Sequence, residues 1–269
     1  MLRLSDCDNK NVRLILKSGE FFEGEAVFCS PEYCFHEYGA AEAALQLDVN
    51  DESFEPGWLL YEHELAEIRL LDKPSARRLH FACEDNFVTI PWSGGKTTQF
   101  LIYPRQADYA ERDFLWRISS ASVEAAESDF TPLPDYHRFI TPLKGSMTLF
   151  RPQDAEVLLN PFDILSFDGA DPTHSRGSCT DFNLMLRKGR ARGNMLRMNL
   201  NGEYQPLPLL EDMQDILLLC PEADCRIRTP FSELLLPAGE LLIGENAASI
   251  SLAAQSKTPA RLLVAQAGV

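Results

Sequence analysis

The sequence predicts an all-β protein. From residue 77 to the C-terminus it consists almost entirely of short segments rich in β-branched and aromatic residues, separated by turn residues, which is typical of a β-sandwich or barrel. Near the N-terminus, KNVRLILKSGEFFEGEAVF (10–28) alternates apolar and polar residues on either side of a Ser-Gly turn, as a β-hairpin does. LLNPFDILSF (158–167) and LLLPAGELLI (234–243) resemble each other, and their prolines lie 76 residues apart, which indicates two stacked barrels.

The first 72 residues are predicted to form a separate small unit. After the hairpin, GAAEAALQLD (39–48) predicts a short helix because Ala and Leu dominate it, and PGWLLYEHELAEIRLL (56–71) predicts one or two further strands. A composition shift and a proline place the domain boundary near Asp72, with residues 73–269 forming the second domain. The stretch VRLILKSG followed by FEG resembles the small five-stranded barrels of Sm-like and SH3-like proteins, which implies that shape for residues 1–72.

The charge of the chain is strongly negative and unevenly distributed. The 269 residues carry a net charge of −15. Residues 1–72 hold 5 Lys or Arg against 16 Asp or Glu, and residues 73–269 hold 20 against 24. An acidic surface repels phosphate, so we expect neither nucleic acid nor an anionic membrane as a partner. The N-terminus MLRLSDCDNK has no apolar leader and no apolar run approaches a membrane span, so we expect a cytoplasmic protein.

The stretch PWSGGKTTQF (91–100) contains Gly-Lys-Thr, the tail of a phosphate-binding loop. Such a loop needs a glycine five residues before the Gly-Lys pair and a helix after it. Ile90 occupies that glycine position, and TTQFLIYP predicts a strand rather than a helix. We therefore interpret Trp92, Gly94 and Gly95 as a glycine turn that lets the backbone approach the rim of a pocket beside an aromatic ring.

Six blocks of sequence resemble the HutD family and occur in the family's order. The resemblance implies a tandem cupin, or bicupin, with two β-barrels in one chain. It also implies a regulatory role in histidine utilisation through binding of a small pathway metabolite. The resemblance implies no established catalytic activity. Two motifs depart from the family pattern, since the turn after Trp92 is one residue short and SDFTPLPD replaces P-F-S-x-F-P-G. The six blocks are WSGGKTTQ (92–99), WRISSA (116–121), SDFTPLPDYHR (128–138), LKG (143–145), PFDILSFDG (161–169) and DFNLMLR (181–187).

Strand alternation sorts the candidate ligand-binding residues. Arg117 and Ser119 share one face of WRISSASV, and Asp181 and Asn183 share one face of DFNLMLR. Such a polar face is ordinary on a solvated sheet and forms a pocket inside a barrel, and the residues alone leave both open. The resemblance favours the pocket for Arg117 and Asn183.

Arginine suits a small carboxylate, because its planar fork donates two parallel hydrogen bonds. We therefore expect Arg117 and Arg138 to hold a carboxylate, unless each merely pairs with one of the many acidic residues. Asp168 or Asp181 would then pair with a cationic or N–H group of the ligand. The resemblance offers urocanate, formiminoglutamate or formylglutamate as that ligand.

No cofactor is expected. The five histidines contain no H-x-H pair of the kind that holds metal in cupin enzymes, and the seven cysteines have irregular spacing that predicts reduced thiols. A metal-free isomerase or hydrolase acting on such a metabolite remains an alternative. A further alternative is an adaptor whose acidic N-terminal barrel binds a protein partner. Many bicupins pair through sheet edges, so a homodimer is also possible.

Overall fold

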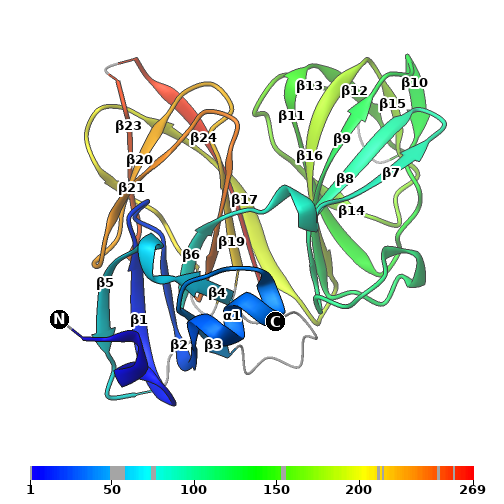
Figure 1. Cartoon of the computed structure of the whole chain (residues 1–269). Coiled ribbons are helices and arrows are strands. Elements are labelled where there is room, and N and C mark those ends of the chain that lie inside the picture. Colours follow the sequence, from blue (N-terminus) through cyan, green and yellow to red (C-terminus); the bar gives the residue numbers. More distant parts are fainter. Residues whose placement is uncertain are drawn as a thin grey trace.

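The protein is all-β, as predicted, with two barrels side by side and a smaller N-terminal unit packed beneath one of them (Figure 1). The computed structural model describes residues 2–48, 58–73, 77–152, 156–210, 213, 215–246, 249–256 and 258–269. Within these ranges the only α-helix is α1 (Pro31–Tyr38), and none is long and apolar enough to cross a membrane. The described residues also form four short 3-10 helices, η1 (Leu4–Cys7), η2 (Glu62–Glu64), η3 (Glu84–Asn86) and η4 (Tyr109–Glu111).

The first barrel encloses an apolar core between two sheets. Ile140 and Ala121 from the larger sheet pack against Leu149 from the smaller one. The larger sheet holds, in order, β14 (Leu165–Asp168), β11 (Tyr136–Gly145), β16 (Cys179–Arg187), β9 (Trp116–Val123), β8 (Gly95–Tyr103) and β7 (Val88–Trp92). The smaller sheet holds β10 (Glu127–Asp129), β15 (His174–Arg176), β12 (Met147–Phe150) and β13 (Val157–Leu159).

The second barrel repeats this plan. One sheet runs through β17 (Arg192–Leu200), β24 (Ala260–Gly268), β19 (Asp215–Leu219), β22 (Leu241–Glu245) and β6 (Arg78–Phe81). The other holds β18 (Gln205–Pro206), β23 (Ser251–Ala254), β20 (Cys225–Arg228) and β21 (Glu233–Leu236). Pro161 lies between β13 and β14, and Pro237 lies between β21 and β22, so both prolines stand where the chain crosses from the small sheet to the large one. The sequence repeat therefore marks equivalent crossings of two barrels.

The N-terminal unit has its strands in the order β5-β1-β2-β3-β4. The predicted hairpin is confirmed, since β1 pairs antiparallel with β2. Among the described residues no ladder joins β4 to β5, so closure into an Sm-like or SH3-like barrel stays a prediction. The strands are β5 (Leu65–Leu70), β1 (Lys10–Leu16), β2 (Phe21–Cys29), β3 (Ala44–Asp48) and β4 (Trp58–Tyr61).

The helix predicted over residues 39–48 is wrong. Residues from Ala44 onward form strand β3, with Leu45 and Leu47 fully buried. The helix lies earlier, where the Ser30 hydroxyl accepts a hydrogen bond from the backbone N–H of Tyr33 at 3.2 Å, and it ends at Gly39 in the left-handed region (φ 73°). The helix thus forms where an N-cap serine and a C-terminal glycine satisfy its ends. The alanine-rich segment after Gly39 has a high helix propensity but does not form a helix.

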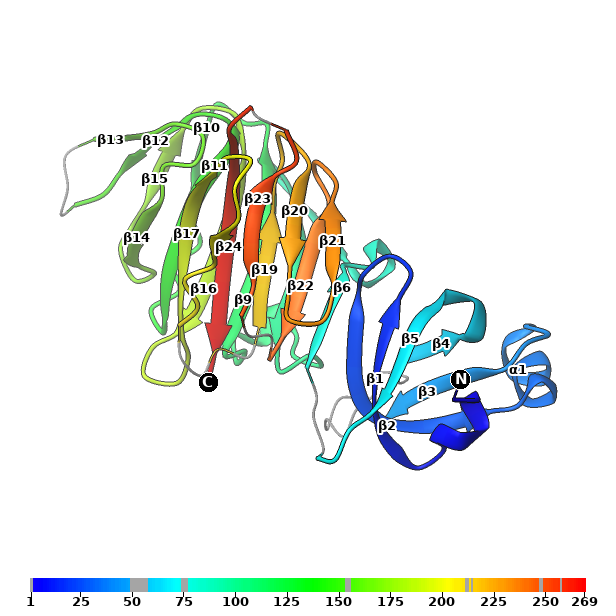
Figure 2. The same cartoon turned by 90° about the vertical axis from the view of Figure 1, so that its left-hand side faces the viewer.

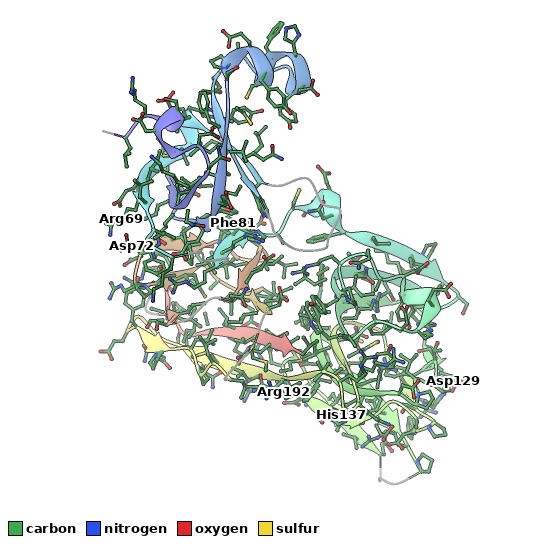
Figure 3. All side chains as sticks on the ribbon, turned by 90° about the horizontal axis from the view of Figure 1, so that it is seen from below. Arg69, Asp72, Phe81, Asp129, His137 and Arg192 are labelled. Atoms are coloured by element: carbon green, nitrogen blue, oxygen red, sulfur yellow. The ribbon has the colours of Figure 1, made fainter. Side chains whose placement is uncertain are left out.

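The N-terminal unit shares a sheet with the second barrel. Strand β2 pairs with β6, so one ten-stranded sheet runs from β17 to the N-terminal strands (Figure 2). Phe81, at the end of β6, lies at this junction (Figure 3), and its backbone N–H donates to the Glu20 carboxylate at 3.0 Å. The domain boundary near residue 72 stays a prediction. The sheet joins β2, which precedes that position in the sequence, to β6, which follows it.

The face of the first barrel that meets the second is apolar. Trp116 and Phe182, both fully buried, pack in one cluster with Leu217 and Leu263 of the second barrel. Since side chains alternate along a strand, this fixes the opposite face of β9 and β16 toward the interior of the first barrel. The solvated alternative for that polar face is excluded.

Candidate functional site

A layer of polar side chains crosses the interior of the first barrel. It consists of five residues that are each at least 93% buried, and we call it the interior polar layer. Register aligns them, because Arg117 pairs with Met185, which pairs with Arg138, while Ser119 pairs with Asn183. Apolar clusters adjoin the layer along the barrel on both sides. The layer comprises Arg117 and Ser119 on β9, Arg138 on β11, and Asp181 and Asn183 on β16.

The two arginines of this layer make few hydrogen bonds. Arg117 donates from Nε to Gln99 Oε1 at 2.7 Å and from Nη1 to Ser119 Oγ at 3.1 Å. Arg138 donates from Nη2 to Asn183 Oδ1 at 3.5 Å, and its buried Nε has no hydrogen-bond partner. Arg138 Nε is therefore a buried donor without a partner among the described residues, as is Nη1 of the neighbouring Arg112, and unsatisfied buried donors are costly.

Aromatic rings surround the arginines. The Tyr109 ring contacts two guanidinium groups, with the Cζ atom of Arg112 at 3.8 Å and that of Arg117 at 4.1 Å from its centroid. The Cζ of Arg138 lies 4.9 Å from the Phe130 centroid and 5.2 Å from that of Phe167. Cation–π contact disperses positive charge without neutralising it, so these rings hold the guanidinium groups in place and leave their charge available.

Positive charge dominates this interior. We call Arg112, Arg117 and Arg138 the arginine cluster, and none of the three forms an ion pair with a described carboxylate. Burial lowers the pKa of Arg117 to about 10, and burial lowers that of Arg138 as well. Arg117 and Arg138 are buried, whereas Arg112 is half-buried, and a buried cation without an ion-pair partner costs several kcal/mol. A bound anion would supply the missing partner.

Asp181 is the acidic group of the interior polar layer. Its Oδ1 accepts hydrogen bonds from the Asn183 amide at 2.6 Å and from the backbone N–H of Ala121 at 3.1 Å. Burial raises the pKa of Asp181 to about 7, against the opposing effects of that N–H, of Arg138 and of Asn183. Near neutral pH the carboxyl is therefore partly protonated, and in that form it donates a hydrogen bond rather than competing with an anion for the arginines.

Four of the predicted site residues lie elsewhere. Asp168 is half-buried at the surface, and its carboxylate accepts a hydrogen bond from Lys188 Nζ at 2.6 Å, which lowers the pKa of the carboxyl. Trp92, Gly94 and Gly95 form the turn between β7 and β8, where Gly95 pairs with Val123 at the far end of β9. Six residues separate Val123 from Arg117, a distance of roughly 20 Å along a strand. The turn is therefore remote from the arginines, although its partner Val123 is only two residues along β9 from Ala121, which pairs with Asp181.

The glycines of that turn allow a close backbone approach, as expected, but to a strand rather than to a pocket. A Cβ on Gly95 would lie 1.9 Å from the Ser122 carbonyl oxygen. The carbonyl of Gly94 accepts hydrogen bonds from the backbone N–H groups of Glu124 and Ala125. The turn thus packs tightly against the end of β9.

Sequence reasoning missed three residues of the site. Gln99 is the last residue of the block WSGGKTTQ (92–99), lies on β8 and pairs with Ser119 across the ladder. Tyr109 and Arg112 belong to the connection between β8 and β9, in and directly after η4. Alternation along β8 could have assigned Gln99 to the interior. The connection between β8 and β9 has no periodic pattern, so the sequence does not reveal that Tyr109 contacts Arg117.

A separate cleft of about 360 Å³ lies between the barrels. Ser120 lines it, and the Ser120 hydroxyl donates to the Asp181 carbonyl at 2.6 Å, so the cleft lies on the opposite face of β9 from Arg117. It does not contain the arginine cluster. Within the described part of the chain, no group of three or more His, Cys, Asp or Glu could hold a metal ion.

The site occurs in a fold shared with known proteins. The conserved protein of unknown function PA5104 from Pseudomonas aeruginosa PAO1 is 22% identical, with a TM-score of 0.59 over 72% of this chain and 100% of that one. HutD from Pseudomonas fluorescens SBW25 is 20% identical, with a TM-score of 0.56 over 71% of this chain and 98% of that one. YhhW from Escherichia coli is 9% identical, with a TM-score of 0.50 over 70% and 97%.

These likenesses confirm the cupin-type fold that the sequence resemblance implied. No curated protein sequence matches the chain. A family model described as HutD matches residues 84–262, which is well over half of the sequence and includes the whole interior polar layer. The protein therefore belongs to the HutD family.

Proposed function

We propose that the first barrel binds a small carboxylate without a metal, and that this binding serves a regulatory role in histidine utilisation. The observation that supports it is the arginine cluster, whose three guanidinium groups lack ion-pair partners among the described residues of a chain with a net charge of −15. An acidic protein has carboxylates in excess, yet the one carboxyl in this layer, Asp181, has its pKa raised to about 7 and forms no ion pair with the arginines. A ligand carboxylate is the group that such an arrangement accommodates.

The rest of the layer suggests how the ligand is oriented. A carboxylate held by Arg117 and Arg138 would lie within reach of the Ser119 hydroxyl and of the Asn183 amide. Asp181 would face the other end of the ligand, where its carboxyl either donates a hydrogen bond or accepts one from an N–H or cationic group. Urocanate, formiminoglutamate and formylglutamate each combine a carboxylate with a nitrogen-bearing end, and they are the candidates for the ligand.

Catalysis is a second candidate function because of one group. A carboxyl with a pKa of about 7 is suited to general acid–base chemistry at neutral pH, and Asp181 has such a value. An isomerase or hydrolase would convert one of the three candidate ligands on incubation with purified protein. Chromatography that detects no product after prolonged incubation would reject catalysis and leave binding.

The test of binding is thermal unfolding of the full chain with each candidate ligand, in the presence and absence of EDTA. At a concentration about a hundred times its dissociation constant, a ligand stabilises the native state by about 2.7 kcal/mol. We expect one candidate to raise the unfolding temperature equally with and without EDTA. No shift with any of the three rejects the proposal, and a shift that EDTA abolishes rejects metal independence.

A further inference from the structure

Helix α1 exposes three aromatic rings. The exposed fractions are 48% for Tyr33, 59% for Phe35 and 48% for Tyr38, while Cys34 is the only buried residue of the helix. The rings of Tyr33 and Tyr38 lie 6.1 Å apart in an edge-to-face contact. Isolated exposed apolar residues are normal, whereas a helix that turns three of eight side chains into exposed aromatic rings is typical of a binding surface.

The helix lies at the tip of the molecule. It projects from the N-terminal unit on the side away from both barrels (Figure 2). Its single buried side chain packs in a small local cluster with Cys29 and Ala44, and not with residues of either barrel. The three aromatic rings are therefore not needed to hold the barrels together, and the described residues leave about half of each exposed.

The stretch of sequence that contains the helix is acidic. Residues 18–68 contain 13 Asp or Glu and no Lys or Arg. Glu32 and Glu37 belong to the helix itself and are exposed, as is Glu25 on the preceding strand β2. A surface of this composition attracts cations and repels phosphate, nucleic acid and anionic lipid.

We propose that α1 and its acidic surroundings form a docking site for a basic segment of another protein, rich in Arg or Lys. Arginine both pairs with carboxylates and stacks on aromatic faces, so one kind of residue satisfies both features of the surface. The protein itself shows this stacking, with the Arg13 Cζ 3.5 Å from the Phe231 centroid. A second copy of this chain is the poorer occupant, because two surfaces of equal acidity repel each other.

This docking site would be an addition to the family core. The family match begins at residue 84. The two Pseudomonas structures align over 100% and 98% of their own length but over only 72% and 71% of this chain. Helix α1 lies outside the matched region, and its role does not depend on the carboxylate site in the first barrel.

The test uses the full chain and a fluorescent peptide built from Arg and Leu, with a matched peptide in which Glu replaces each Arg. Fluorescence anisotropy should show binding of the Arg peptide alone, weaker at high salt because the attraction is screened. The variant Y33S/F35S/Y38S should weaken that binding about tenfold. The control V88S/I90S, which removes exposed apolar side chains from β7, should bind as the wild type does. Equal binding by the two variants overturns the proposal.

A second pair of variants tests the proposal even if Y33S/F35S/Y38S fails to fold. E25Q/E37Q removes two charges from the acidic surface and should weaken binding several-fold, whereas E111Q/E203Q removes two exposed charges elsewhere and should not. Equal affinities for these two variants also overturn the proposal. Sedimentation that reveals a dimer of the wild type, dissociated by Y33S/F35S/Y38S, would overturn it by making a second copy the occupant.

Discussion

The amide nitrogen of Asn183 donates to Asp181 Oδ1 at 2.6 Å, two residues away on the same strand and fully inside the first barrel. Even with this bond, burial raises the pKa of Asp181 from 3.8 to about 7. The folded chain thus binds a proton that the unfolded chain releases. Stability contributed by the protonated carboxyl is present below pH 4 and is lost as the pH rises from about 4 to about 7.

We predict that Asp181→Asn abolishes the loss of stability that the wild type shows as the pH rises from about 4 to about 7. At about 1.4 kcal/mol for each pKa unit, the wild type should lose up to about 4 kcal/mol relative to the variant between pH 4 and pH 7. Urea unfolding at several pH values measures it. Asp168→Asn is the control, because Lys188 lowers the pKa of that surface carboxyl and its titration falls below this window. Parallel pH profiles for the wild type and Asp181→Asn would contradict the prediction.

Arg117→Met should leave the ligand-free protein at least as stable as the wild type. The substitution removes a buried guanidinium that has no ion-pair partner, and burying such a charge costs several kcal/mol, which outweighs the loss of its hydrogen bonds to Gln99 and Ser119. Thermal unfolding without ligand measures it, with the exposed Arg190→Met as control. A clear loss of stability would indicate that Arg117 has a structural role in the barrel.

Glu23→Gln should strongly destabilise the N-terminal unit. The Glu23 carboxylate is completely buried at the junction with the second barrel, where Arg77 Nε donates to it at 3.1 Å and Arg13 Nε at 2.6 Å. Removing one partner of a buried ion pair leaves uncompensated charge and costs about 3–5 kcal/mol. Chemical denaturation compares it with Glu25→Gln, an exposed position on the same strand. Similar midpoints for the two variants would show that the junction does not depend on this pair.

Gly95→Ala should reduce stability and leave carboxylate affinity unchanged. Its Cβ would lie 1.9 Å from the Ser122 carbonyl oxygen, so β7 and β8 must shift at a cost of about 1–3 kcal/mol. Gly202→Ala, whose Cβ has its nearest neighbour at 3.9 Å, is the control. The affinity, measured well below the unfolding temperature, distinguishes a structural turn from a binding turn. If folded Gly95→Ala binds the carboxylate more weakly than the wild type, the turn is part of the ligand site.

The faces of individual strands were predictable because alternation is a local property. It grouped Arg117 with Ser119 and Asp181 with Asn183, and the structure places all four in one layer. Which face turns inward was not predictable from alternation, since that depends on the packing of Trp116 against residues more than a hundred positions later in the chain. Asp168 shows the same limit, because it follows inward-facing Phe167 and so points outward beside His137.

The connections between strands were predicted less well than the strands. Tyr109 and Arg112 complete the arginine cluster from a connection whose path depends on tertiary contacts. In the N-terminal unit, the alanines before Leu45 suggested a helix, whereas the sheet imposed the strand β3. The pairing of β2 with β6 joins segments more than fifty residues apart, and no local pattern in either strand indicates it.

The central claim is that the arginine cluster binds a carboxylate, and calorimetric titration of the wild type and of Arg117→Met tests it most directly. Urocanate, formiminoglutamate and formylglutamate are each titrated into both proteins, with Arg190→Met as the charge-matched control. We predict that one of them binds the wild type and the control equally, and that Arg117→Met binds it at least tenfold more weakly, as expected for the loss of a buried charge-assisted pair. Equal affinity for the wild type and folded Arg117→Met would contradict the claim.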